Sequence, residues 1–344
     1  MSRITDLLRL DHPIVLGPFG GGASSVELAV AVSNAGGLGG FGAVQLSPDE
    51  ITEAIAACRA GTDRAFNVNL WVSTHDVPEE DYDGWDAAVQ RLKPLYDALG
   101  IAPPERPPRS AYAFEPQAEA LLAARPPVFS FVYGIPSPAV LDACREAGIF
   151  TIGTAVTVEE AVALDQAGVD AIVASGFEAG GHRIAFLRAA EDSLVGTLSL
   201  VPAVVDAVEA PVIAAGGISD RRQVRAAFEL GADAVQVGTA FLATRQSGAT
   251  AEHRHALTHG PRLTRLTRSI TGRLARGLDT AITTAEVAAP YPYQAALIGP
   301  ILGAAQRQGR EDLFAFWAGQ SAPLLAPDRD AAELLRELAG DDQR

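Results

Sequence analysis

Short apolar runs, most of them bounded by glycine or proline, recur along the whole chain. A run of this kind, only a few residues long, is typical of a strand buried in a parallel sheet. Between most runs lies a longer segment in which apolar residues return at helical spacing. Eight such runs predict eight strands, at residues 14–16, 38–43, 65–72, 127–134, 150–155, 171–174, 211–217 and 232–239.

Capping residues mark where several of the intervening helices begin and end. Ser47 is followed by Pro48 and Glu50, which is the pattern of a capping box with proline in the first turn. Thr157 and Gly168 delimit another helix in a similar way. Strands and helices therefore alternate in an α/β protein. Eight repeats predict a (β/α)8 TIM barrel, with a doubly wound parallel sheet as the alternative.

Two segments interrupt the alternation. Residues 73–127 form a long insert after the third strand. A connection of this length more often covers an active site or is disordered than serves as a plain connection without a role. Residues 245–320 extend beyond a simple barrel, and we expect an additional, mostly helical substrate or lid region over the barrel mouth. The barrel itself is expected within residues 1–244, and residues 321–344 should close back on it.

Composition narrows the function classes. The formal net charge of −15 argues against nucleic-acid or anionic-membrane partners, because both need a basic surface. The chain lacks a signal-peptide pattern and an apolar run of membrane-spanning length, so we expect a cytoplasmic protein. Lys93 is the only lysine, which leaves little room for Schiff-base or pyridoxal chemistry. Cys58 and Cys144 fall in predicted helices and are expected to be small buried hydrophobes.

The stretch after the sixth strand carries the strongest candidate for chemistry. Glycine pairs beyond a strand end let a ligand approach the backbone closely, and Gly180 and Gly181 form such a pair. His182 follows directly, and an imidazole at the mouth of the sheet can handle protons. Glu178, nearby, could either orient that imidazole or cap the local turn.

Glycines also follow the seventh and eighth strands. In barrels of this kind a phosphate site is frequently built there, from backbone N–H groups and a helix N-terminus. The residues in these positions are Gly216, Gly217, Gln236, Gly238 and Thr239.

Metal and nucleophile patterns are weak. His253, His255 and His259 recur at helical spacing, but no cysteine and no HExxH frame supports a zinc site, so we expect a solvated polar face and no metal. The nucleophile elbow of serine hydrolases is also missing.

Several longer stretches together are more specific than any single motif. They are SVELAVAVSNAGGLGGFGA, NVNLWV, EAGGHR, EDSLVGTLSLVPAVVDAV, PVIAAGGISD, VQVGTAFL, TRSITGRLARGL and FWAGQ. With these stretches the chain resembles the nitronate monooxygenase family, also called 2-nitropropane dioxygenases, over nearly its whole length. Members of that family are FMN-dependent barrels without metal.

The resemblance implies a cofactor site and a catalytic residue. It implies FMN contacts at Pro18, Phe19, Gly20, Asn69, Ser175, Gly180, Gly181, Gly216 and Gly217, and a phosphate grip at Gln236, Gly238 and Thr239. An amide at Asn69 can hydrogen-bond a flavin ring, which would explain its presence in a buried strand. His182 matches the family's catalytic histidine, which accepts a proton from neutral nitroalkanes or holds the nitronate anion.

The sequence departs from the family pattern at four places, all expected near the site. Phe19 stands where Met is common, Ser175 where Gln is usual, Ile184-Ala185 where Gly-Thr is expected, and Asp279-Thr280 where Asn is expected. Aromatic residues that could line a substrate pocket are Phe19, Tyr133, Tyr291 and Tyr293.

The implied activity is oxidation of alkyl nitronates, such as propionate 3-nitronate, by O2 to a carbonyl compound and nitrite, in a monomer or homodimer. An NAD(P)H-dependent flavin reductase of quinones or enoyl thioesters is the alternative, since enoyl-thioester reductases of this fold carry an EAGGH-like motif. A flavin- or phosphate-binding protein without turnover is the third possibility.

Overall fold

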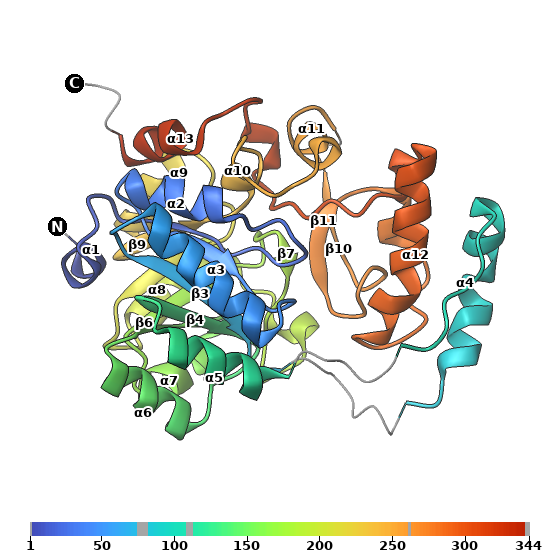
Figure 1. Cartoon of the computed structure of the whole chain (residues 1–344). Helices are drawn as coiled ribbons and strands as arrows, with labels where there is room; N and C mark the ends of the chain where they lie inside the picture. Colours follow the sequence, from blue (N-terminus) through green and yellow to red (C-terminus); the bar gives the residue numbers. More distant parts are fainter. Residues whose placement is uncertain (1, 74–81, 108–112, 261–262, 341–344) are drawn as a thin grey trace.

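The computed structural model describes residues 2–73, 82–107, 113–260 and 263–340, and its centre is a parallel barrel (Figure 1). Every predicted run coincides, within its length or to within one residue, with one of its strands. The strands are β1 (Ile14–Leu16), β2 (Gly39–Gly42), β3 (Phe66–Trp71), β4 (Val128–Val132), β5 (Phe150–Ala155), β6 (Ala171–Ser175), β8 (Val212–Ala215) and β9 (Ala234–Val237).

The sheet closes on itself. Its strands lie in the order β1-β9-β8-β6-β5-β4-β3-β2, and all neighbouring pairs are parallel. The two ends meet where Val15 bridges Leu38, and the Leu38 N–H donates to the Ile14 carbonyl oxygen at 2.9 Å. The (β/α)8 prediction is therefore confirmed, and a doubly wound open sheet is excluded.

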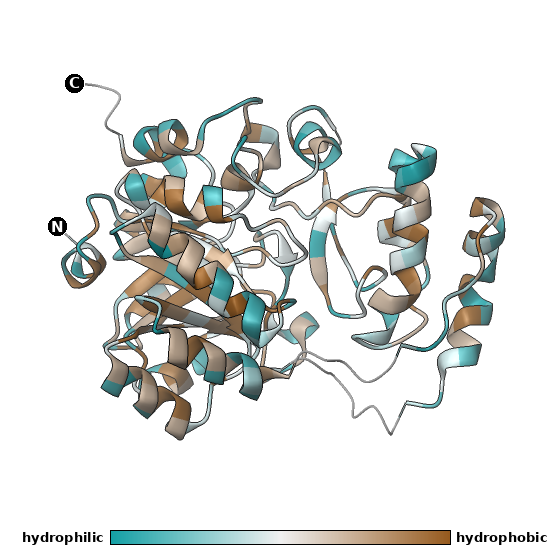
Figure 2. Cartoon of the chain, viewed as in Figure 1, coloured by the Kyte–Doolittle hydropathy of each residue, from teal (hydrophilic) through white to brown (hydrophobic). Residues whose placement is uncertain are grey.

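Helices cover the outside of the barrel. Figure 2 shows strands that are mostly hydrophobic, whereas the surrounding helices mix hydrophobic and hydrophilic residues. The predicted capping box at Ser47 is present, since its hydroxyl accepts from the Glu50 N–H and the Glu50 carboxylate accepts from the Ser47 N–H. The helices are α2 (Val26–Asn34), α3 (Pro48–Gly61), α5 (Phe114–Ala124), α6 (Pro138–Ala147), α7 (Val158–Gln166), α8 (Thr197–Val205), α9 (Arg221–Glu229), α10 (Thr239–Leu242) and α13 (Ala331–Ala339).

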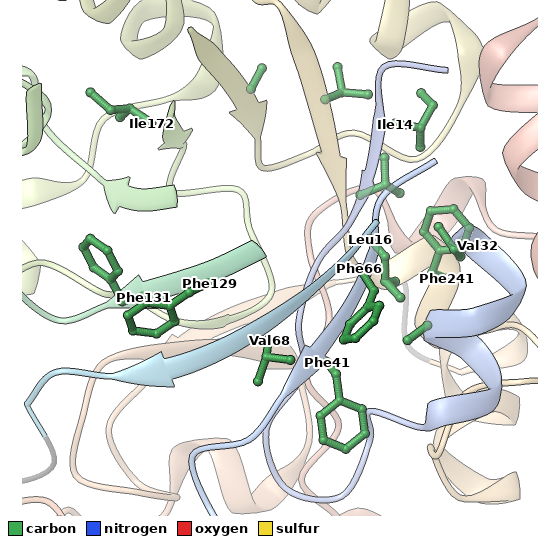
Figure 3. Packing of buried hydrophobic residues seen from close by; sticks show 14 of the residues in the cluster. Ile14, Leu16, Val32, Phe41, Phe66, Val68, Phe129, Phe131, Ile172 and Phe241 are labelled. Carbon is green, nitrogen blue, oxygen red and sulfur yellow. The ribbon is translucent and has the colours of Figure 1, made fainter. Parts of the chain in front are cut away.

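The main core lies between the strands and these helices (Figure 3). Leu16, Phe66 and Phe241 are fully buried in it, and Cys58 and Cys144 belong to the same cluster. Burial raises the pKa of each thiol to about 11, so both cysteines are protonated hydrophobes, as expected.

A smaller core fills the barrel interior at its amino-terminal end. Helix α1 (Arg3–Leu8) contributes Ile4, which packs with Val15, Val173 and Ile213 from the strands. This end of the barrel is therefore closed, and the carboxyl ends of the strands are left to form a site.

Residues 245–320 combine helices with strands. Helices α11 (Ala251–His259) and α12 (Tyr293–Gln308) accompany two strands that the sequence pattern did not reveal, β10 (Thr264–Thr267) and β11 (Ala275–Leu278). Together with β7 (Gly181–His182) these strands form a three-stranded antiparallel sheet in the order β10-β11-β7. The strands are short and contain arginine and threonine, so no apolar run marks them.

The long insert contributes helix α4 (Trp85–Leu99), which packs against α12 rather than on the barrel (Figure 1). The buried Tyr96 hydroxyl donates to the Leu297 carbonyl oxygen at 2.8 Å, and Gln308 donates to the Leu99 carbonyl oxygen at the same distance. Within the described ranges, every helix is too short or too polar to cross a membrane.

Candidate functional site

A cavity of about 310 Å³ lies at the carboxyl ends of the barrel strands. His182 and every residue expected to contact the cofactor line it. These residues are His182, Pro18, Phe19, Gly20, Asn69, Ser175, Gly180, Gly181, Gly216, Gly217, Gln236, Gly238 and Thr239. The fold thus brings together side chains and glycines from most of the barrel strands and from the connection after β6.

The backbone of His182 is held in a sheet, not in a free loop. His182 lies opposite Ala275 of β11, and the Arg183 N–H donates to the Leu274 carbonyl oxygen at 2.7 Å. Gly181 has φ of +76°, a conformation that favours glycine, and a Cβ there would meet no atom within 4 Å. The open space beside Gly181 belongs to the cavity.

The other residues of the EAGGHR stretch build the walls. The Glu178 carboxylate accepts hydrogen bonds from the Thr197 N–H and hydroxyl, both at 3.0 Å, so it holds the start of α8 and does not orient the imidazole. The buried Arg183 guanidinium donates to the Gly176 and Ser175 carbonyl oxygens at the end of β6. Since Glu178 and Arg183 are engaged in these contacts, His182 is the residue of the stretch whose side chain can react with a ligand in the cavity.

His182 is neutral in this environment. Its ring lies among aromatic residues, with centroids 5.1 Å from Trp71 and 5.5 Å from Trp317. Burial, and secondly the positive charge of Arg273, lower the pKa of His182 to about 3. At neutral pH the imidazole therefore carries no charge, and its two nitrogens can share hydrogen bonds.

An arginine bracketed by aromatic rings stands behind His182. The Arg273 guanidinium lies 3.9 Å from the Tyr133 ring centroid and 4.2 Å from that of Tyr291, and it donates to the Ser73 carbonyl oxygen at 3.0 Å. Tyr291 lines the cavity, as expected of a pocket wall. Tyr293 does not, because it stacks on Tyr82 at 4.4 Å where α4 meets α12.

Polar groups form the floor of the cavity. The side-chain amides of Asn67 and Asn69 both donate to the Ser130 hydroxyl oxygen, at 2.8 and 2.9 Å. These bonds give both side-chain amide groups of the buried strand an acceptor. Since Ser130 accepts twice, its own hydroxyl hydrogen remains available to an acceptor in the cavity, alongside Thr154 and Ser175.

The glycine-rich side is shaped by close backbone packing. Gly216 has φ of +101°, and a Cβ there would lie 2.8 Å from the Gly176 carbonyl oxygen. Gly180 has no room either, since a Cβ would lie 2.6 Å from the Gly319 nitrogen. The Gly319 N–H also donates to the Thr239 hydroxyl at 2.9 Å, so the late WAGQ stretch forms part of the wall.

Sequence reasoning missed several residues that line the cavity, among them Trp71, His253, Thr271 and Trp317. The expected solvated face of α11 is wrong for His253, whose ring N–H at Nε2 donates to the Trp317 carbonyl oxygen at 3.0 Å. A helical spacing of three and four residues to the buried Ala256 and Leu257 could have revealed this.

The other two histidines of α11 are exposed, and the His255 and His259 rings stack at 4.5 Å. In the part of the chain that the structure describes, groups of three or more histidines, cysteines or carboxylates that could hold a metal ion are absent.

Two of the four departures from the family pattern are partly or wholly remote from the cavity. Phe19, Ser175 and Ile184 line it, but Ala185, Asp279 and Thr280 are not among the lining residues. The expectation of proximity is wrong for Asp279-Thr280, because Asp279 pairs with Arg265 at 2.8 Å and lines a different hollow beside α11.

Comparison with known proteins agrees with this geometry. Residues 1–341 match the sequence pattern of the family described as nitronate monooxygenase. The nitronate monooxygenase of Pseudomonas aeruginosa is 41% identical over 98% of this chain and 98% of its own length.

Solved structures show the same relationship. The nitroalkane oxidase of Streptomyces ansochromogenes superimposes with a TM-score of 0.89 and is 37% identical over 98% of this chain and 97% of its own. FabK from Thermotoga maritima is more distant, with a TM-score of 0.77 and 29% identity over 99% and 96% of the two chains. This chain belongs to the nitronate monooxygenase family of flavin-dependent oxidoreductases, whose members oxidise small-molecule nitronates.

Proposed function

We propose that the protein binds FMN in the cavity and oxidises alkyl nitronates, such as propionate 3-nitronate, with O2 to a carbonyl compound and nitrite. The observation that carries the proposal is the placement of a neutral His182 in the same cavity as the glycine-rich strand ends. An electrically neutral imidazole next to a redox cofactor suits a substrate that is itself an anion or becomes one.

The residues present fit FMN. The ring would lie against the floor, where Asn69 and the spare hydroxyl hydrogen of Ser130 offer hydrogen bonds, and against the open space beside Gly181. Pro18, Phe19, Gly20, Ser175 and Gly180 would complete the ring site. The phosphate would be held by Gly216, Gly217, Gln236, Gly238 and Thr239, whose backbone and hydroxyl groups line the cavity.

The chemistry that FMN supplies when bound is electron transfer between the nitronate and O2. His182 takes the proton from the carbon of a neutral nitroalkane and, once protonated, donates a hydrogen bond to a nitronate oxygen. Trp71 and Trp317 flank the imidazole and contribute to its burial. Proton abstraction needs the imidazole to be uncharged before the substrate binds.

Colour and product formation test the proposal. The purified protein should show flavin absorption and should release nitrite and consume O2 when propionate 3-nitronate is added. The variant His182→Gln should keep its FMN and lose at least about 100-fold of the turnover on neutral nitroethane, as expected for removal of a general base. A colourless protein would contradict the cofactor assignment, and unchanged turnover on nitroethane would contradict the role of His182.

The flavin reductase is the second candidate, because the EAGGHR stretch of this chain resembles the EAGGH-like motif of enoyl-thioester reductases of this fold. It predicts rapid bleaching of the flavin by NADH under anaerobic conditions. Slow bleaching by NADH together with rapid nitronate oxidation would support the monooxygenase.

A further inference from the structure

The segment Thr271–Arg273, part of the TGRLARG stretch, has no role in the function proposed above. It connects β10 to β11 and lies beside the end of β7 that carries His182. Gly272 has φ of +92°, and a Cβ there would lie 2.5 Å from the Tyr291 nitrogen, so the turn admits only glycine. Arg273 is buried between two tyrosine rings. The segment is therefore held firmly on both sides of Thr271.

The Thr271 hydroxyl oxygen has three polar neighbours. His182 Nε2 lies at 2.9 Å, and the backbone N–H and carbonyl oxygen of Arg273 both lie at 3.3 Å. The Arg273 N–H can only donate to the hydroxyl oxygen, and the Arg273 carbonyl oxygen can only accept from it. The contact with His182 can run in either direction, depending on the imidazole tautomer.

One arrangement satisfies all three contacts. A hydroxyl has one hydrogen and two lone pairs. If the hydrogen goes to the Arg273 carbonyl oxygen, both lone pairs accept, one from the Arg273 N–H and one from an N–H at Nε2 of His182. If the hydrogen goes to Nε2 instead, the Arg273 carbonyl oxygen faces a hydroxyl oxygen without a hydrogen between them.

We infer that Thr271 is a positioning residue that holds His182 as the Nε2–H tautomer and so leaves Nδ1 as the nitrogen that accepts the substrate proton. Among the residues that the structure describes, none forms a hydrogen bond with Nδ1 of His182. This inference rests on the proposed function of His182 and adds to it the atom that acts and the residue that orients it.

Nitrogen-15 NMR of the purified holoenzyme tests the tautomer without any turnover. The spectrum of His182→Gln identifies the His182 signals by their disappearance. At neutral pH we expect a proton bound to Nε2 and protected from exchange with water, and none on Nδ1. In Thr271→Val, which keeps the shape of threonine, this protection should be lost. A proton on Nδ1 of the wild type, or unchanged protection in the valine variant, would overturn the inference.

Kinetics give the second readout. Thr271→Val should lower kcat on neutral nitroethane about tenfold, the equivalent of a hydrogen bond worth about 1.4 kcal/mol. Turnover of preformed propionate 3-nitronate should stay nearly unchanged, because no proton is taken from it. Thr271→Ser should restore most of the loss. Thr52→Val on the exposed outside of α3 is the matched control, because its hydroxyl donates to the Pro48 carbonyl oxygen of its own helix.

The two proposals fail in different ways. Equal losses on both substrates in Thr271→Val, or no loss on either, would overturn the role of Thr271 while leaving nitronate oxidation by the wild type intact. If the wild type itself does not oxidise nitronates, the proposed function fails, and the NMR result still decides which tautomer Thr271 holds.

Discussion

The depressed pKa of His182 should make the protein less stable in mild acid. In the unfolded chain the imidazole titrates near its ordinary value of 6.5, whereas in the folded protein its pKa is about 3. Between these values the unfolded chain binds a proton that the folded protein does not, so lowering the pH favours unfolding. The contribution of His182 to the free energy of unfolding is therefore present above pH 6.5 and is lost as the pH falls toward 3.

The size of the effect follows from the same two values. When the pH falls from about 7 to about 5, this difference in proton binding lowers the free energy of unfolding of the wild type by about 2 kcal/mol. Most of this loss occurs below about pH 6.5. His182→Gln removes this contribution and leaves the other histidines in place. The variant should therefore lose about 2 kcal/mol less than the wild type over this interval.

Urea denaturation at matched FMN content, repeated at several pH values, measures the difference. His253 also has a pKa lowered by burial, but it is present in both proteins and cancels in the comparison. Parallel stability curves for the two proteins would refute the reasoning, because they would mean that His182 titrates alike in the folded and unfolded states.

Three further changes probe other contacts. Gly180→Ala should lower FMN content, measured by absorbance, because its Cβ would lie 2.6 Å from backbone atoms of Ala318 and Gly319. Tyr96→Phe should cost about 1 kcal/mol in urea denaturation without changing activity, since it removes the buried hydrogen bond from the Tyr96 hydroxyl to the Leu297 carbonyl oxygen. Asp279→Asn should leave nitrite release unchanged, because Asp279 pairs with Arg265 outside the cavity, and a clear loss would contradict that placement.

The barrel could be predicted from the sequence because its strands are continuous apolar runs that end in small residues. Val212–Ala215, for example, is followed directly by the glycine pair that turns the chain. β11 could not be predicted in this way, since its buried Arg276 donates to the Phe177 carbonyl oxygen and breaks the apolar run. A strand whose polar residue is satisfied by a distant contact has no local signature.

The candidate site was predictable only in part, for a similar reason. The glycines and His182 stand in motifs that can be located along the chain. Thr271 and Trp317 reach His182 from far away in the sequence, through the sheet that joins β11 to β7. Their positions beside His182 depend on that strand pairing, and the pairing cannot be predicted from the spacing of residues along the sequence.

The packing of α4 against α12 has a consequence for the order of events during synthesis. The apolar face of α4, formed by Trp85, Leu92 and Tyr96, leaves the ribosome long before its partner helix. Tyr96 and Leu297 are 201 residues apart, so at about 5–20 residues per second this face waits about 10–40 s for α12. The barrel strands can begin to pair during this interval. The apolar face of α4 meanwhile stays exposed and can associate with other nascent chains.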